Sequence, residues 1–233
     1  QLLPAAVVAY FKDTGTLTQN NKLTVLDVEE TAPLLSEKVV LTDIVSAKLP
    51  IAAAEMGRLH VFRPKNGAEE HYAMEIGKPS RSEPILVRIH SACFTGDVLG
   101  SLKCDCGIQL QSALMQMGQS GSGILLYLNQ EGRGIGLANK MRAYSLQNEG
   151  FDTVEANHRL GFEDDERDFR LASSILKELG ISNIQLMTNN PAKILMMEAN
   201  DITVSKRVAL ISDRNKHNEA YMVTKSKKSG HLL

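Results

Sequence analysis

The sequence predicts an α/β fold in which a mixed sheet is flanked by helices, with a short extra segment at the N-terminus. Short strand-like runs bounded by Gly or Pro occupy residues 59–90. Beyond them, stretches with helical spacing of apolar residues alternate with apolar runs of strand length, at 108–128 and again at 169–188. This alternation is typical of helices packed on a sheet, and the first strands, expected to be antiparallel, make the sheet mixed.

The first half of this fold is predicted from four runs. Residues 59–62, 71–76 and 85–90 are short and partly alternating, so we expect antiparallel strands that lead to Cys93. The stretch I-Q-L-Q-S-A-L-M-Q-M at 108–117 repeats its apolar residues at helical spacing and predicts a helix.

The second half begins with G-I-L-L-Y-L at 123–128, a continuous apolar run of strand length. Residues 139–148 have the pattern of a helix. Residues 169–180 predict an amphipathic helix that ends at Gly180. The following I-Q-L-M-T-N-N-P at 184–191 predicts a strand that runs into a turn.

The chain is expected to divide into three parts. Residues 1–44 form an extra N-terminal segment of unknown role, residues 45–210 form the domain that carries the cysteine, glycine-rich and charged motifs, and residues 211–233 form a polar, basic C-terminal tail. The first residue is Gln1 rather than Met, so the native N-terminus is expected to be missing or trimmed.

Composition argues against several classes of partner. Lys and Arg total 26 against 27 for Asp and Glu, and 43% of the residues are apolar, which is ordinary for a folded domain and gives no basic footprint for nucleic acid. The longest apolar run, residues 2–10, is too short to span a bilayer and has no basic region ahead of it. We therefore expect a cytoplasmic protein without nucleic-acid or membrane partners.

The three cysteines, Cys93, Cys104 and Cys106, fall within fourteen residues. Cys104 and Cys106 are poorly placed to pair with each other, so the pattern indicates reduced thiolates rather than a disulfide scaffold. Zinc is the expected ion, since three thiolates leave the fourth tetrahedral position open, as in catalytic sites. Two alternatives stay open: three buried thiols that pack as small apolar groups, or a structural zinc completed by His90.

A glycine-rich stretch, E-G-R-G-I-G at 131–136, lies between a predicted strand and a predicted helix. Its glycines allow a ligand to approach the backbone, and Arg133 could pair with phosphate oxygens. A glycine-rich turn with a solvated arginine explains the same letters nearly as well.

Two further clusters have both a functional and a plain structural interpretation. Asp165 and Arg167 could share a pocket as a proton acceptor and a phosphoryl contact, or belong to a charged loop ahead of a helix. Thr188 and Lys193 follow the strand at 184–187, at the edge where α/β sheets bind ligands. The Asn-Asn-Pro sequence between them also predicts a simple turn.

Six motifs follow one another along the chain: R-I-H-S-A-C-F-T-G-D-V-L-G-S-L-K-C-D-C-G at 88–107, N-Q-E-G-R-G-I-G at 129–136, K-M-R-A-Y at 140–144, D-T-V-E-A-N-H-R-L-G-F at 152–162, D-D-E-R-D-F at 164–169 and L-M-T-N-N-P-A-K at 186–193. In this order they resemble GTP cyclohydrolase II, the first committed enzyme of riboflavin synthesis. The resemblance runs from about residue 45 to the end of the chain, and identifies 45–210 as a catalytic domain.

The resemblance implies that a homodimer hydrolyses GTP to 2,5-diamino-6-ribosylamino-4(3H)-pyrimidinone 5′-phosphate, formate and pyrophosphate. It implies one Zn²⁺ per subunit on Cys93, Cys104 and Cys106, and Mg²⁺ with the GTP phosphates. Water activated by zinc would attack C8 of guanine, which is then lost as formate.

Carried over by position, Asp165 is the proton acceptor, Arg167 the nucleophile on the α-phosphate, and Tyr144 a residue of the ring-opening step. A need for Arg167 would also be explained if it stabilises charge at the α-phosphate. This alternative stays open because a guanidinium, with a pKa above ~12, keeps its proton and is a poor nucleophile. The implied GTP-binding positions are Arg88, Ile89, His90, Ser91, Ala92, Gln109, Glu131, Gly132, Arg133, Thr153, Thr188 and Lys193.

Two positions depart from the pattern that is common in the family. Ala92 stands where H-S-E-C is frequent, so this chain places no carboxylate side chain directly before Cys93, and Asn129 stands where an arginine is common. The alternative function is therefore a catalytically weakened paralogue that binds GTP and zinc in a regulatory or partner-supporting role. We expect activity to survive, and we expect His90 and His158 to be structural rather than zinc ligands.

Overall fold

The computed structural model describes residues 41–65, 67–210 and 215–227, together with positions 15, 18, 27, 29, 30, 230 and 232. The chain divides into two compact units, residues 1–38 and 39–233, and the sheet and its helices belong to the second unit. Most of the expected N-terminal segment 1–44 lies outside the described residues. Its expected end falls inside the first strand, β1 (Leu41–Lys48).

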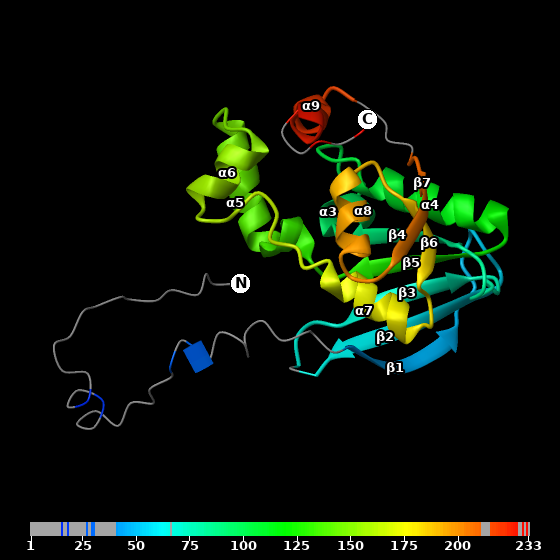
Figure 1. Cartoon of the computed structure of the whole chain (residues 1–233). Coiled ribbons are helices and arrows are strands. Elements are labelled where there is room, and N and C mark those ends of the chain that lie inside the picture. Colours follow the sequence, from blue (N-terminus) through cyan, green and yellow to red (C-terminus); the bar gives the residue numbers. More distant parts are fainter. Residues whose placement is uncertain are drawn as a thin grey trace. The chain divides into compact units, whose positions relative to one another are not determined.

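In the part of this unit that the structure describes, the chain forms seven strands and a series of helices (Figure 1). The strands are β1, β2 (Gly57–Pro64), β3 (His71–Ile76), β4 (Ile85–Ser91), β5 (Gly123–Leu128), β6 (Asn183–Met187) and β7 (Thr203–Val208). The helices are α3 (Phe94–Asp97), α4 (Cys106–Ser120), the 3₁₀ turn η1 (Glu131–Gly134), α5 (Gly136–Asn148), α6 (Thr153–Arg159), α7 (Arg170–Glu178), α8 (Pro191–Glu198) and α9 (Glu219–Lys227). Among the described residues, none of these helices is long and apolar enough to cross a membrane.

The strands form one mixed sheet in the order β1-β2-β3-β5-β4-β6-β7. The half from β1 to β5 is antiparallel, whereas β5, β4, β6 and β7 run parallel to one another. The mixed α/β fold is therefore confirmed, but the prediction that the strand at 85–90 is antiparallel is wrong. The reason is that β5 lies between β3 and β4, so β4 pairs in parallel with β5 and β6.

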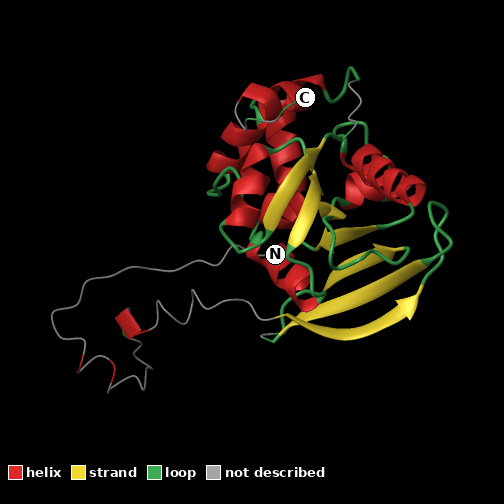
Figure 2. Cartoon of the chain, turned by 45° about the vertical axis from the view of Figure 1, so that its right-hand side comes forward, coloured by secondary structure: helices red, strands yellow, loops and turns green. Residues whose placement is uncertain are grey.

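Helices cover both faces of the sheet (Figure 2). On one face Met117 of α4 belongs to an apolar cluster with Leu125 of β5. On the other face Ile175 of α7 belongs to a larger cluster with Leu126 of β5. Because successive side chains of a strand point to opposite faces, a strand covered on both sides must be apolar throughout, which explains the unbroken G-I-L-L-Y-L run.

Local capping explains two helices that periodicity did not predict. The Asp152 side chain accepts hydrogen bonds from Val154 N and Glu155 N while Glu155 reaches back to Asp152 N, which is a full capping box for α6. The Asn190 side chain caps α8 by accepting a hydrogen bond from Ala192 N, and Pro191 occupies the first helical position. The C-terminal stretch contains α9, whose Met222 is buried.

The fold brings three chain segments to one edge of the sheet. Parallel strands β4, β5 and β6 end at Ser91, Leu128 and Met187, so the segments that follow them leave the sheet on the same side. The chain crosses from β4 to β5 on one side of β4 and returns to β6 on the other. Such a reversal opens a crevice outside the carboxyl ends of the strands, where α/β proteins bind ligands.

Candidate active site

A cavity at this edge gathers most of the residues that the sequence singled out. Its lining includes sixteen of the predicted positions, namely Arg88, His90, Ser91, Ala92, Cys93, Cys104, Cys106, Gln109, Glu131, Gly132, Arg133, Tyr144, Thr153, Arg167, Thr188 and Lys193. Two predicted positions are absent from the lining. The Ile89 side chain is buried in the apolar core, and Asp165 contacts the cavity residue Arg167.

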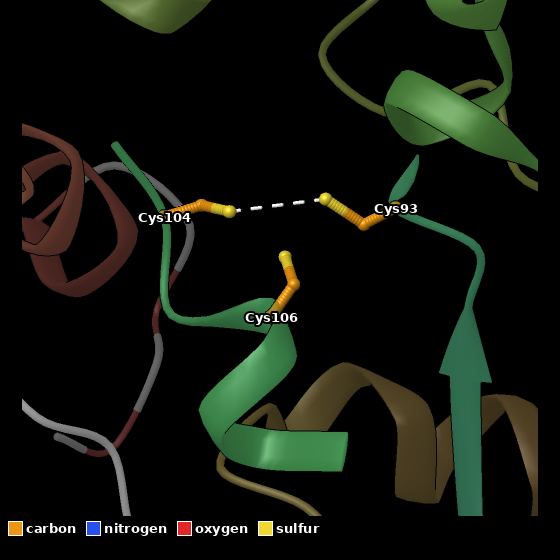
Figure 3. A group of neighbouring side chains, drawn as sticks. All are labelled: Cys93, Cys104 and Cys106. Atoms are coloured by element: carbon orange, nitrogen blue, oxygen red, sulfur yellow. Dashed lines mark hydrogen bonds between the residues drawn. The ribbon is translucent and has the colours of Figure 1, made fainter. Parts of the chain in front are cut away.

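The three cysteines, which all line the cavity, point toward one another (Figure 3). Cys93 lies just beyond the end of β4, Cys104 lies in the loop before α4, and Cys106 is the first residue of that helix. Their sulfur atoms all lie within 4.8 Å of one another, and Cys93 Sγ and Cys104 Sγ are 3.8 Å apart. All three cysteines are free thiols rather than disulfides.

This spacing fits a zinc ion. Sulfurs bound to one tetrahedral zinc at about 2.3 Å lie about 3.8 Å apart. Space for the cluster depends on Gly96 of α3, because a Cβ added there would lie 2.9 Å from Cys104 Sγ and 3.0 Å from Cys93 Sγ. Among the described residues, these cysteines are the one group of His, Cys, Asp or Glu side chains close enough together to hold a metal ion.

A buried lysine contacts the cluster. Lys140 Nζ donates hydrogen bonds to Cys93 Sγ at 3.1 Å, Thr95 Oγ1 at 2.9 Å and Glu131 Oε1 at 2.9 Å. Burial acts to lower the pKa of Lys140, but its bonds to Glu131 and Cys93 outweigh burial and raise that pKa. The pKa of Cys93 lies far below its ordinary value, because Cys104 and Cys106 donate to its sulfur and Lys140 adds positive charge.

Glu131 is held by the protein on both carboxylate oxygens. Oε1 accepts from Lys140 and from Gly132 N at 2.8 Å, and Oε2 accepts from Phe94 N at 2.6 Å. Each carboxylate oxygen can accept about two hydrogen bonds, so Oε2 keeps one acceptor position for a ligand. The carboxylate therefore ties the segment after β5 to the segment after β4.

A second buried network joins Arg88 to α4. Its guanidinium donates to Gln109 Oε1 at 2.7 Å and to Met187 O at 2.9 Å, while Gln109 Nε2 donates to Asp105 Oδ2 at 2.6 Å. Burial lowers the pKa of Arg88 to about 10, so the side chain remains charged at neutral pH. Arg88 Nε is buried with no hydrogen-bond partner among the described residues, which favours a further acceptor at this point.

Arg167 and Asp165 form a paired group at the cavity wall. Arg167 Nε donates to Asp165 Oδ1 at 2.7 Å, and Arg167 Nη1 donates to Ser91 Oγ at 3.3 Å. The Arg167 guanidinium also lies 4.9 Å from the centre of the Phe169 ring. Burial favours the neutral form of Asp165, but hydrogen bonds and charge from Arg167 outweigh it and lower the pKa of the carboxyl.

The predicted residues after β6 also face the cavity. Lys193 is buried, donates to Ile89 O at 3.0 Å, and lies 5.0 Å from the centre of the Phe169 ring. Thr188 Oγ1 accepts from Asn190 N at 3.0 Å and so shapes the turn into α8. Thr153 is the first residue of α6.

The glycine-rich stretch adopts a conformation that few residues accept. Gly132 has φ 64° and Arg133 has φ 63°, both in the left-handed region. A non-glycine residue held there stores about 1 kcal/mol or more of strain, and such residues cluster at ligand sites. Arg133 is fixed by a hydrogen bond from Nη1 to Asp164 O at 3.1 Å.

His90 and His158 each contact an aspartate of the protein. His90 Nε2 lies 3.0 Å from both carboxylate oxygens of Asp97, which also accepts from Cys93 N and from the Tyr127 hydroxyl. Burial lowers the pKa of His90 despite the bond to Asp97. His158 forms an exposed ion pair with Asp164. Neither histidine belongs to the metal-binding group of the described residues.

Tyr144 and several unpredicted residues complete the lining. Burial raises the pKa of Tyr144, whose ring lies 4.9 Å from Lys103 Nζ and 5.8 Å from Lys140 Nζ. Sequence reasoning missed Lys140 and Tyr221, since a lysine or tyrosine on a polar helix has no pattern that reveals its direction. The other unpredicted lining residues are Ile135, Ala143, Gln147, Asn157, Asn189 and Asn190.

Comparison with known proteins gives the cavity its context. The family model described as GTP cyclohydrolase II matches residues 42–209, which include the described lining of the cavity except Tyr221. The chain belongs to the GTP cyclohydrolase II family. Membership places it among the hydrolases.

Curated relatives of this family differ in length. A GTP cyclohydrolase-2 of Azospirillum brasilense is 46% identical over 238 residues, covering 100% of this chain and 62% of that protein. A GTP cyclohydrolase-2 of Pseudomonas aeruginosa is 49% identical over 190 residues, covering 82% and 92%. The riboflavin biosynthesis protein RibBA of Bacillus mycoides is 48% identical over 198 residues, covering 84% and 49%. The chain thus spans less than two thirds of the first and third of these relatives.

Proposed function

We propose that this chain is a zinc-dependent GTP cyclohydrolase II of riboflavin biosynthesis, which converts GTP to 2,5-diamino-6-ribosylamino-4(3H)-pyrimidinone 5′-phosphate, formate and pyrophosphate. The observation that carries the proposal is that one cavity is lined both by the three cysteine sulfurs and by a group of buried or half-buried cationic side chains. A reaction that opens a purine ring and releases pyrophosphate needs a hydrolytic centre and phosphate-binding cations within the length of one nucleotide.

Cys93, Cys104 and Cys106 would hold the zinc ion. Bound zinc supplies activated water at neutral pH, which is the chemistry that hydrolysis at C8 of guanine requires. Around this point the protein offers polar groups to a purine: Gln109 retains one amide N–H, and Glu131 Oε2 retains one acceptor position. Tyr144, in the same lining, is proposed to act in ring opening.

The cationic side chains would bind the triphosphate. Arg167 and Lys193 both lie against the Phe169 ring, and Arg167 contacts Ser91 at the end of β4. Mg²⁺ is proposed to accompany the phosphates. The ion pair with Asp165 favours a charged Arg167 that stabilises the developing charge at the α-phosphate, over an arginine that attacks it as a neutral nucleophile.

Because Arg167 lowers the pKa of Asp165, this carboxylate is a weak base while the two side chains are paired. We propose that Asp165 accepts a proton once Arg167 has moved away from it or engages the phosphate. We also propose a homodimer with one zinc per subunit and a cytoplasmic location.

The second candidate is a paralogue that binds GTP and zinc with weakened turnover. It is favoured by Ala92, which lines the cavity beside Cys93 and offers no carboxylate. One experiment separates the two functions: zinc-replete protein is incubated with GTP and magnesium, and formate, pyrophosphate and absorbance of the diaminopyrimidine are measured together. Equimolar formate and pyrophosphate support the cyclohydrolase. Tight GTP binding with neither product supports the paralogue, and pyrophosphate alone overturns the ring-opening assignment.

A further inference from the structure

Lys140 occupies a position between the metal-binding thiolates and the carboxylate of Glu131. It lies on α5, and its side chain is 11% exposed against 16% for Glu131. Nζ reaches Cys93 Sγ, Thr95 Oγ1 and Glu131 Oε1, which come from the segments after β4 and after β5. A single ammonium therefore joins two of the three segments that form the cavity.

The hydrogen-bonding capacity of this ammonium is fully used. A lysine has three N–H donors, and three acceptors lie within 3.1 Å of Nζ. To contact a substrate phosphate, Lys140 would have to give up one of these bonds inside a buried network, which is costly. Its position thus suits a permanent contact of the protein better than a contact of the substrate, although it lines the cavity.

The positive charge of Lys140 would balance negative charge at the metal site. Three thiolates and one divalent ion carry one net negative charge, and the neighbouring Glu131 carboxylate adds another. A buried excess of negative charge is unfavourable unless a cation compensates it. Lys140 supplies that cation at hydrogen-bonding distance from one thiolate and from the carboxylate.

We infer that Lys140 is a positioning residue that strengthens metal binding, through an N–H···S hydrogen bond to Cys93 and a bridge from Cys93 to Glu131. The inference rests on the proposed function only in taking the cysteines as metal ligands; it does not require turnover of GTP. Partners that hydrogen-bond to metal ligands typically contribute a factor of roughly 10 to 100 to metal affinity.

The test is a titration of the metal-free protein with Co²⁺, followed by competition with Zn²⁺ under a chelator. Lys140→Met should weaken both affinities by roughly 10- to 100-fold. It should also move the thiolate-to-cobalt charge-transfer band to lower energy, because loss of the N–H donor raises the energy of the sulfur lone pairs. Lys140→Arg should restore part of both effects, since it keeps a cationic donor.

Lys103→Met is the matched control. It removes the same charge from a lysine whose Nζ lies 4.9 Å from the centre of the Tyr144 ring but donates to Asn148 rather than to sulfur. Unchanged cobalt affinity and an unchanged band in Lys140→Met would overturn the inference, as would an equal effect of Lys103→Met. If Lys140→Met does not fold, Lys140→Gln takes its place, because glutamine removes the charge and keeps a neutral donor. The cobalt affinity and the position of the charge-transfer band are then measured on that variant.

Failure of the inference is distinguishable from failure of the proposed function. An unmodified protein that binds Co²⁺ through its thiolates and does not convert GTP contradicts the function alone. A protein that converts GTP, and whose Lys140 variants bind Co²⁺ with unchanged affinity and spectrum, contradicts the inference alone.

Discussion

Two carboxylate–guanidinium pairs with the same spacing follow one another in the sequence at the start of α7, whose first residue is Arg170. Asp165 pairs with Arg167, and Asp168 pairs with Arg170, in each case with the arginine two residues after the acid. Only the first pair reaches the cavity among the described residues, through Arg167, whereas the Arg170 side chain is 51% exposed. This stretch thus contains a candidate phosphate contact, Arg167, and a second arginine, Arg170, that is paired in the same way and can serve as its control.

We expect Arg167→Ala to lower the rate of pyrophosphate release about 100- to 1000-fold, the usual loss when one charge-stabilising donor is removed. Arg170→Ala, which breaks the exposed pair, should leave the rate within about twofold, since surface ion pairs contribute little. Steady-state assays of pyrophosphate at saturating GTP measure both. Equal losses in the two variants would assign the effect to the stability of the loop.

At the metal cluster, Cys104→Ser should abolish zinc binding and formate release together. A serine hydroxyl is a weak zinc ligand in place of a thiolate, and two remaining sulfurs leave the site incomplete. Metal content after dialysis and formate release are measured on the same sample. Full turnover by a zinc-free Cys104→Ser protein would contradict the proposed role of the metal.

The elements around the cluster meet through their backbones. A Cβ on Gly107, in the first turn of α4, would lie 2.2 Å from Gly96 O of α3, so α3 rests directly on the start of α4. This contact sets how close the segment after β4 comes to Cys104 and Cys106. The geometry of the sulfurs is therefore a property of the α3–α4 packing as well as of the cysteines themselves.

Gly96→Ala tests this packing. Its methyl group would lie 2.9 Å from Cys104 Sγ and 3.0 Å from Cys93 Sγ, so we expect zinc affinity to fall about tenfold or more, equivalent to ~1.4 kcal/mol. Gly180→Ala is the control: Gly180 has φ 71° and open space, so alanine costs about 1 kcal/mol of stability without approaching a sulfur. Competition with a chelator and thermal unfolding separate the two effects. Identical zinc affinities in both variants would contradict the steric role of Gly96.

At the scale of the whole molecule, the sequence predicts best what short-range patterns determine. The helix at 108–117, the strand at 123–128 and the helix at 169–180 are confirmed as α4, β5 and α7. The direction of β4 could not be predicted this way, because its partners β5 and β6 begin more than thirty residues later in the chain. Strand order depends on long-range packing, which periodicity does not record.

The candidate site likewise contains residues that short-range sequence patterns predict and residues whose positions depend on long-range packing. Cysteines and charged motifs that stand at the ends of strands could be found from their spacing, because parallel strands bring their carboxyl ends to one edge. Lys140 stands in the K-M-R-A-Y motif, but its contact with Cys93 could not be predicted from the sequence. The direction of its side chain is set by packing of α5 against η1, where a Cβ on Gly132 would lie 3.1 Å from Lys140 Cβ.

Buried histidines give the folded protein a defined response to acid. His71 of β3 is buried, its Nδ1 accepts a hydrogen bond from Asn129 N at 3.1 Å, and burial lowers its pKa. The pKa of His90 is lowered as well, chiefly by burial. Since burial makes each ring bind a proton less readily in the native state than in the unfolded chain, whose histidines bind protons below pH about 6.5, stability is fully present above that pH and decreases as the pH falls.

We therefore expect the free energy of unfolding to decrease as the pH is lowered from about 6.5 towards about 5, with each histidine contributing up to ~1.4 kcal/mol per pH unit. His71→Gln should remove one part of this slope, because a glutamine oxygen can accept the Asn129 N–H bond and does not titrate in this range. Urea unfolding at a series of pH values measures the slope for this variant and for His217→Gln, which changes an exposed histidine. A slope that is the same in His71→Gln and in the unmodified protein would show that His71 is protonated in the native state as readily as in the unfolded chain.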